Sequence, residues 1–283
     1  LSRQTWPMAR YMWKTKAVFV WAHDVHVGTG KEVEEQLQKV DGLLALSRWH
    51  RQNMVNLYPG VDRNKFLVTR NGIDVKRFEE EPVKISGRMI YASSPDRGLE
   101  TLLDLVPRVT EEVPWASLHV YYGFDTWTKI AEATNDVAAK TRMAAILTKM
   151  QALSNVTYFG RVGQGELARA YSEAEVWAYP TAFTETSSIS AMEAQAAGAV
   201  PVTSFLAALC ETVKHGFLVP GHLSDSEYQD EWVKTAVTLL KDKEKRKKYS
   251  KSAREYALEN LGWDKVAGQW DDLFRETLAA KRD

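Results

Sequence analysis

Two hydrophobic patterns alternate along the chain. In the longer segments, apolar residues recur every three or four positions, as at Leu99, Leu102, Leu103 and Val106, which is typical of helices. The shorter segments are continuous apolar or aromatic runs and predict strands at 17–21, 43–46, 66–69, 88–92, 117–121, 156–159, 175–179, 200–203 and 217–219. Because helical segments separate most of the strands, the pattern predicts an α/β fold whose parallel sheets are covered on both faces.

A polar segment interrupts this alternation. The sequence Asn-Gly-Ile-Asp at 71–74 has turn chemistry, and the acidic, proline-containing stretch that follows it does not favour a helix. A new series of strands and helices then begins at Arg88. We therefore expect a first domain over 1–78 with about three strands, and a second over 85–255. A last helix over about 263–280 has an apolar stripe that can pack back on the first domain.

The composition narrows the class of protein. The 283 residues contain 37 basic and 37 acidic side chains, and this balance argues against a dedicated nucleic-acid binder. The single cysteine, Cys210, cannot form an internal disulfide and fits a cytoplasmic setting. No apolar run approaches the roughly 20 residues that span a bilayer. The segment Lys241–Lys248 holds six cations and two acids, so it predicts a solvated helix face or, alternatively, peripheral contact with anionic lipid headgroups.

The segment from Tyr179 to Gly198 joins a strand end, a polar loop and a predicted helix. The helix is expected to begin near Ser187, a good N-cap type, and to end at Gly198, a good C-cap type. The loop therefore follows the carboxyl end of a strand, where ligands of open α/β sheets bind. A helix start with small hydroxyl residues suits a phosphate, because free backbone amides and the helix dipole favour an anion.

Two glutamates lie eight residues apart in this segment, Glu185 in the loop and Glu193 inside the predicted helix. Carboxylates accept hydrogen bonds from sugar hydroxyls without the help of a metal ion. Placed around a phosphate-binding helix start, they suit a phosphate that is bound to a sugar on each side. Each glutamate taken alone is more simply a solvated side chain.

The E-x7-E spacing, the preceding Tyr-Pro and the trailing Glu-Ala-x-Ala-x-Gly-x-x-Pro-Val resemble the donor site of retaining GT-B glycosyltransferases (glycosyl transferases group 1, family 4-like). The resemblance implies two facing Rossmann-like domains, here with an incomplete first domain and a complete, doubly wound second domain. It also implies that Glu193 binds the ribose and that Glu185 binds the donor sugar. The helix start at Ser187, Ser188 and Ile189 would hold the distal phosphate.

A second segment carries the same resemblance. Ser-Ser-Pro-Asp-Arg-Gly, after the first strand of the second domain, resembles the family's paired cations that neutralise the diphosphate. Arg97 fits the second cation, whereas Ser93 or Ser94 stands near the place of the first. Gly160 and Arg161 match the base-side loop, and Arg161 is a candidate to replace the missing cation. Arg97 is accordingly expected to stabilise the leaving diphosphate.

His23 follows the first predicted strand, and many relatives place a histidine facing the donor sugar at such a strand end. His23 is therefore a candidate for orienting the donor sugar or the leaving group, with a hydrogen-bonded structural histidine as the equal alternative. A metal pair with His26 is disfavoured because no further ligand cluster accompanies it. No metal ion and no cofactor beyond the donor substrate is expected.

Other site classes are poorly matched. Gly-Thr-Gly-Lys at 28–31 lacks the earlier glycine and the Ser or Thr of a P-loop, and no strand is followed by G-x-G-x-x-G. The predicted activity is transfer of a sugar from a UDP- or GDP-linked donor to a glycan, a lipid-linked sugar or a protein. Two alternatives stay open: a sugar-nucleotide-binding fragment or degenerate module without full activity, and a sugar-nucleotide epimerase.

Overall fold

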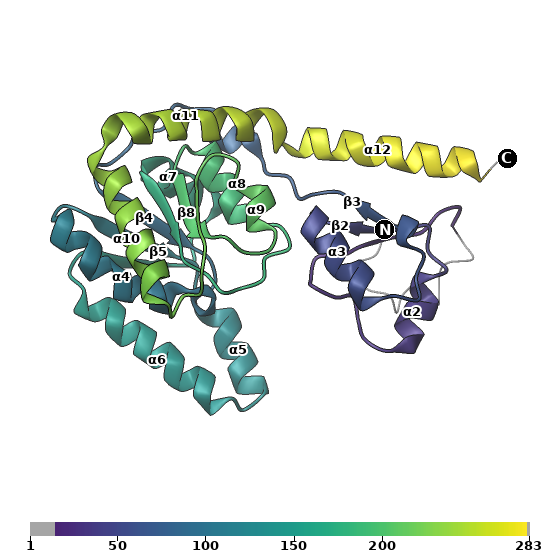
Figure 1. Cartoon of the computed structure of the whole chain (residues 1–283), viewed down its shortest axis with the longest axis horizontal. Coiled ribbons are helices and arrows are strands. Elements are labelled where there is room, and N and C mark those ends of the chain that lie inside the picture. Colours follow the sequence, from purple (N-terminus) through teal and green to yellow (C-terminus); the bar gives the residue numbers. More distant parts are fainter. Residues whose placement is uncertain (1–14, 282–283) are drawn as a thin grey trace.

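The computed structural model describes residues 15–281 and contains two parallel β-sheets (Figure 1). The nine strands lie within two residues of their predicted bounds, and the predicted α/β class is confirmed. They are β1 (Phe19–Trp21), β2 (Gly42–Ala45), β3 (Phe66–Val68), β4 (Arg88–Ala92), β5 (Ser117–Tyr121), β6 (Val156–Gly160), β7 (Val176–Tyr179), β8 (Val200–Ser204) and β9 (Phe217–Val219).

The first sheet is small, with strand order β1-β2-β3. Its connections contain the helices α2 (Lys31–Leu37) and α3 (Arg48–Leu57). The side chain of Ser47 caps α3 by accepting a hydrogen bond from the His50 amide at 3.0 Å. A separate apolar cluster supports this sheet, and its fully buried members include Val20, Leu37, Leu43 and Met54.

The second sheet has six strands in the order β6-β5-β4-β7-β8-β9. The chain begins in the middle at β4, winds outward through β5 and β6, and then returns to β7 beside β4. The winding therefore changes direction between β4 and β7. In open α/β sheets the ligand crevice lies outside the carboxyl ends of the strands at such a switch point.

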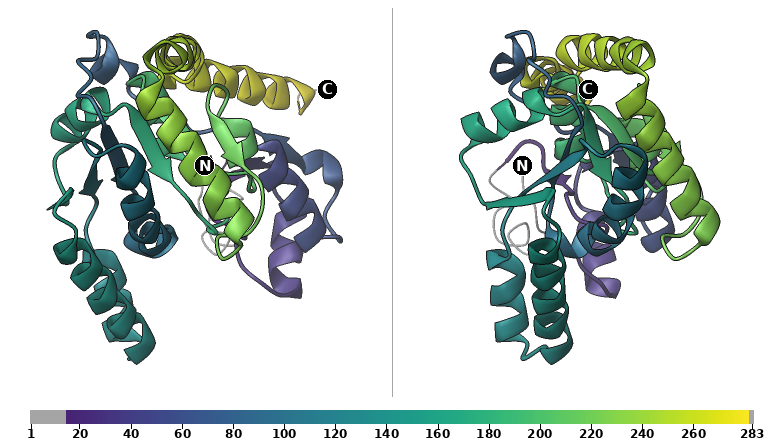
Figure 2. Two further views of the ribbon diagram at one scale, coloured as in Figure 1. Left: turned by 60° about the vertical axis from the view of Figure 1, so that its left-hand side comes forward. Right: turned by 90° about the vertical axis from the view of Figure 1, so that its left-hand side faces the viewer.

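Helices cover both faces of the second sheet (Figure 2). On one face α4 packs against α6 and α10, and on the other α8 packs against α7 and α11. Two further helices complete this part of the chain: α5, which forms a hairpin with α6, and the short helix α9. The bounds are α4 (Leu99–Glu112), α5 (Asp125–Ala133), α6 (Val137–Ala152), α7 (Gln164–Glu173), α8 (Ile189–Ala196), α9 (Leu209–Thr212), α10 (Ser226–Lys241) and α11 (Lys243–Asn260).

The chain passes between the two sheets at two places that lie side by side. Ile73 donates its amide to the carbonyl of Leu261 at 2.8 Å and accepts from the Trp263 amide at 3.2 Å. From there α12 (Trp263–Ala280) runs along the first sheet (Figure 1). The ring of Trp270 lies 4.7 Å from that of Trp21. The last helix is therefore part of the packing of the first sheet.

The basic segment 241–248 spans the end of α10 and the first turns of α11. Three of its six cations are paired within the protein: Lys241 with Glu112, Arg246 with buried Glu175, and Lys247 with Glu244. Contact of the remaining cations with lipid headgroups stays a prediction. Within residues 15–281, no helix is both long and apolar enough to cross a bilayer.

Candidate functional site

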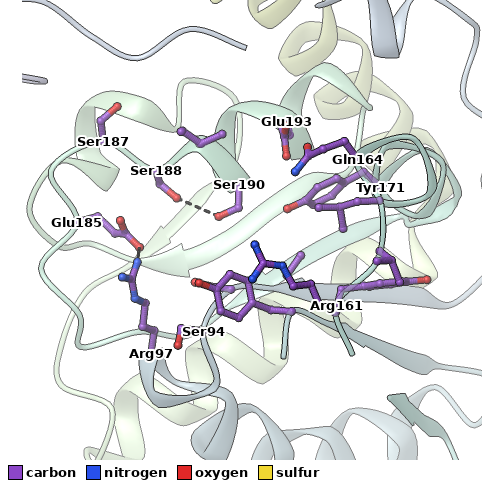
Figure 3. A pocket seen from close by; sticks show the side chains of 17 residues that line it. Ser94, Arg97, Arg161, Gln164, Tyr171, Glu185, Ser187, Ser188, Ser190 and Glu193 are labelled. Atoms are coloured by element: carbon purple, nitrogen blue, oxygen red, sulfur yellow. Dashed lines mark hydrogen bonds and ion pairs between the residues drawn. The ribbon is translucent and has the colours of Figure 1, made fainter. Parts of the chain in front are cut away.

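A cavity of about 320 Å³ opens at the carboxyl ends of β4 and β7, at the point where the winding changes direction. Its volume is within the range of small-molecule sites. It brings together seven of the nine residues proposed for the site from the sequence, several of which are labelled in Figure 3. They are Arg97, Arg161, Glu185, Ser187, Ser188, Ile189 and Glu193.

The start of α8 forms one wall of the cavity. Its N-cap is Ser188, whose side chain accepts a 3.4 Å hydrogen bond from the Ala191 amide, so the helix begins at Ile189. The predicted start near Ser187 was therefore one residue too early, because both serines are good caps by type and the backbone conformation selects the second. The first amides of a helix have no partner within the helix. The start of α8 therefore presents free N–H donors at the cavity wall.

Glu185 is buried and is held by two side chains from neighbouring strand ends. The Tyr179 hydroxyl donates to its Oε1 at 2.8 Å, and Arg97 Nη1 lies 3.3 Å from the same oxygen. The guanidinium of Arg97 also lies over the ring of Phe183, 3.8 Å from the centroid. Burial raises the pKa of Tyr179 well above its usual value, so the phenol stays a proton donor. Arg97 and Tyr179 thus fix the Glu185 carboxylate at the cavity wall.

Glu193 is also buried, and its partner comes from the segment between the two sheets. Arg77, in a short 3-10 helix at Val75–Phe78, places Nη2 2.5 Å from Glu193 Oε1. Its Nη1 donates to Gln164 Oε1 at 2.7 Å. Burial raises the pKa of Glu193, and Arg77 opposes this by favouring the carboxylate. Sequence reasoning missed Arg77, because it lies 116 residues from Glu193 and no local motif marks it.

Gly98 explains how Arg97 reaches Glu185. It has a left-handed φ of 116°, and a Cβ at this position would lie 1.8 Å from the carbonyl oxygen of Pro180. Only glycine tolerates both the conformation and this approach of two backbones. The loop after β4 therefore lies directly against the end of β7, and the two loops that carry Arg97 and Glu185 meet.

The last two proposed residues lie at the edge of this arrangement. Gly160 ends β6 with a φ of 68° and directly precedes Arg161. The backbone carbonyl of His23 accepts a 2.8 Å hydrogen bond from Thr186 Oγ1, which joins the first sheet to the loop of Glu185. The His23 ring contacts the ring of Trp21 at 4.1 Å and is not among the cavity-lining groups. A role of this ring toward the donor stays a proposal.

The cavity wall contains another residue that sequence reasoning missed. Tyr122, just after β5, has a φ of 83° although it is not glycine; the residue is 44% exposed and lines the cavity. A bulky residue in this conformation is rare and is associated with functional sites. Among residues 15–281, no three histidine, cysteine or acidic side chains lie close enough together to hold a metal ion.

Residues 88–256 match the family of glycosyl transferases group 1. The chain belongs to this family. The matched range contains every residue that lines the cavity, whereas the first sheet and Arg77 lie outside it.

Curated proteins are similar to the chain at 23% to 34% identity. The chain is 23% identical to α-maltose-1-phosphate synthase of Mycobacterium tuberculosis over 248 residues, which cover 84% of the chain and 64% of that protein. It is 34% identical to D-inositol 3-phosphate glycosyltransferase of Corynebacterium efficiens over 118 residues, 42% of the chain and 27% of that protein. The chain thus spans just under two thirds of the first relative's length.

Solved structures show the same GT-B fold. Sucrose-phosphate synthase from Thermosynechococcus elongatus superposes with a TM-score of 0.76 at 19% identity, over 98% of this chain and 72% of that one. The Anabaena protein HepE, in complex with UDP-glucose, gives 0.73 at 14% identity, over 95% and 74%. The expectation of two Rossmann-like domains is therefore confirmed, with three strands in the described part of the first.

Proposed function

We propose that this protein transfers a sugar from a UDP- or GDP-linked donor to an acceptor hydroxyl with retention of configuration. One observation carries the proposal: two buried carboxylates, eight residues apart, flank the free amides of a helix start in one cavity at the switch point of the sheet. The family assignment supports transfer of a sugar, and structural neighbours bound to UDP or UDP-glucose support the class of donor.

The proposed donor spans the cavity from α7 to the loop of Glu185. Glu193, oriented by Arg77, accepts hydrogen bonds from the ribose hydroxyls. The amides at Ser188 and Ile189 bind the distal phosphate, where the dipole of α8 favours negative charge. Glu185 accepts from hydroxyls of the donor sugar, and its fixed position makes it selective for their placement.

The main barrier to such a reaction is the negative charge that develops on the leaving diphosphate in the transition state. Arg97 and the amides of α8 are placed to stabilise that charge, and neither needs to reorganise during the reaction. Attack by the acceptor from the same face, assisted by the leaving phosphate, gives retention without an enzyme nucleophile. The proposal requires no metal ion.

Nucleotide release from UDP-glucose, UDP-N-acetylglucosamine and GDP-mannose, with and without candidate acceptor sugars, tests this function. Glu185→Gln removes the charge that Arg97 and Tyr179 hold, so we expect release to fall at least about a hundredfold while nucleotide binding is kept. Glu166→Gln, an exposed glutamate on α7, is the matched control and should leave the rate unchanged.

The products of the same assay separate the alternatives. A new glycosidic product supports the transferase. Formation of a 2-epimer from donor alone indicates the epimerase, and binding without any turnover indicates a binding module. Full activity of Glu185→Gln would contradict the role assigned to that carboxylate.

A further inference from the structure

A second cavity, of about 370 Å³, lies between the two sheets and is called the inter-domain cavity below. From the first sheet it is lined by Arg48, at the start of α3, and by Arg70, just after β3. Lys214, which follows α9, lines it from the second sheet. Ser187 lines both this cavity and the one at the ends of β4 and β7, which is called the donor cavity because the proposed donor binds there. The two cavities are therefore neighbours.

The inter-domain cavity carries an excess of positive charge. Across the described range, neither Arg48, Arg70 nor Lys214 forms an ion pair, whereas Arg77, Arg97 and eleven other basic residues do. Unpaired cations gathered at one concavity concentrate positive potential and attract anions.

Glu211 is the one carboxylate among the residues that line this cavity, and it is already engaged. Its two oxygens accept hydrogen bonds from the amides of Arg48 and Trp49 at 2.9 and 2.6 Å. It therefore satisfies the start of α3 instead of pairing with the three cations. Three cations against one carboxylate leave the cavity with two positive charges in excess, which matches a phosphate dianion.

Ser187 supplies a second, independent observation. The residue is only 8% exposed, and its hydroxyl oxygen is buried without a hydrogen-bond partner among the described residues. A buried hydroxyl left unpaired costs free energy, so such groups normally have a partner. In Figure 3 its hydroxyl points away from Arg97 and Arg161, and thus not into the donor cavity. The residue also lines the inter-domain cavity, and rotation of its buried side chain would bring the hydroxyl to a ligand oxygen there.

We propose that the inter-domain cavity binds a phosphate monoester carried by the acceptor substrate, an inference that rests on the proposed transferase function. The two guanidinium groups of Arg48 and Arg70 suit the planar, bidentate recognition of phosphate oxygens. The volume leaves room for a sugar attached to that phosphate. Because Ser187 is two residues from Glu185, an acceptor held here lies beside the donor sugar.

Calorimetric titration with inorganic phosphate, on the whole chain saturated with UDP, tests the site while the donor cavity is filled. We expect phosphate to bind, and Arg70→Gln or Lys214→Gln to weaken it by about tenfold each, because each removes one charge-assisted contact. Lys129→Gln, an exposed lysine on α5 without an ion pair in the described chain, is the control and should bind as the parent does. Absence of phosphate binding, or equal affinity in all variants, overturns the site.

Nucleotide titrations of the same variants keep the two proposals apart. Arg70→Gln should bind UDP with unchanged affinity, whereas Glu193→Ala should lose UDP and still bind phosphate. If UDP fails to bind the parent chain, the donor assignment fails, and phosphate titration of the free chain still tests Arg70 and Lys214. The inter-domain site is then tested by the variants of its own residues alone.

A free phosphate ion and a phosphorylated acceptor offer the same chemistry, and kinetics distinguish them. If the acceptor carries the phosphate, the sugar phosphate should be a far better acceptor than the sugar. Arg70→Gln should then raise its KM about tenfold with little change in kcat, and inorganic phosphate should compete with it. Phosphate that alters the rate without competing with the acceptor would overturn the acceptor assignment in favour of an effector site.

Discussion

The two sheets contribute to the site in different ways. The second sheet builds the whole donor cavity from residues between Ala92 and Glu193, all inside the range that matches the family. Among the described residues, the first sheet contributes no side chain to the lining of that cavity, and a hydrogen bond from Thr186 to the His23 carbonyl joins it to the loop of Glu185. Its charged side chains instead line the inter-domain cavity. The lining of this cavity is thus local to one sheet, while contributions from the first sheet depend on how the two sheets meet.

We expect the largest effect on the donor cavity from Gly98→Ala. The new methyl group would meet the Pro180 carbonyl, so the loops of Arg97 and Glu185 must separate. We expect the free energy of unfolding to fall by about 3 kcal/mol or more, with loss of nucleotide binding. Gly268→Ala in α12, where nothing lies within 4 Å of the added methyl, is the control and should be neutral or slightly stabilising. Equal denaturation midpoints for the two variants would contradict this account.

Lowering the pH should destabilise the first sheet through protonation of His50. This ring is fully buried, accepts from the Leu46 amide at 3.1 Å and donates to the Asp24 carbonyl at 2.9 Å, which requires the neutral form. Burial lowers the pKa of His50 to about 4. Because the unfolded state binds the proton more readily, stability should fall as the pH drops from about 6.5 to about 4, by at most about 3 kcal/mol.

His50→Gln isolates this effect, since glutamine can donate and accept without titrating. Denaturation at pH 7 and pH 5 should show a smaller loss of stability for the variant than for the parent chain. Donor binding by the second sheet should survive at pH 5 in both. An identical loss in parent and variant would show that His50 is not the source.

Arg77→Ala tests how far the donor cavity depends on the segment between the sheets. Without Arg77, the buried Glu193 carboxylate loses the group that lowers its pKa, so it protonates more readily. We expect nucleotide affinity to fall by about ten- to a hundredfold, or about 2 kcal/mol. The loss should lessen as the pH is raised, because ionised Glu193 returns. Arg77→Lys should recover part of the affinity. Nucleotide affinities equal to the parent's in both variants would show that Arg77 does not contribute to the site.

The smallest expected effect concerns Tyr122. Its left-handed backbone is unfavourable for a bulky residue, so Tyr122→Gly should raise the free energy of unfolding by about 1 kcal/mol. The same change removes a ring from the cavity wall, so nucleotide affinity should fall while stability rises. Tyr122→Phe keeps the ring and the strain, and should match the parent in both measurements. Reduced stability of the glycine variant would argue against stored strain.

Much of the second sheet could be predicted from the sequence because its signals are local. Apolar runs marked the strands to within two residues, and the segment around Glu185 and Glu193 marked the cavity wall. The cap of α8 was misplaced by one residue because serine type alone does not set backbone conformation. Arg77 and Tyr122 could not be predicted, since one depends on a contact across 116 residues and the other on a positive φ.

The central claim is that the second sheet binds a nucleoside diphosphate through Glu193. Calorimetric titration of the whole chain with UDP, GDP and ADP tests it most directly, in the parent, Glu193→Ala and the exposed control Glu166→Ala. We predict that one nucleotide binds the parent and the control equally and that Glu193→Ala weakens it at least tenfold, by about 1.4 kcal/mol or more. Binding of none of the three nucleotides, or equal binding by all three proteins, would contradict the account.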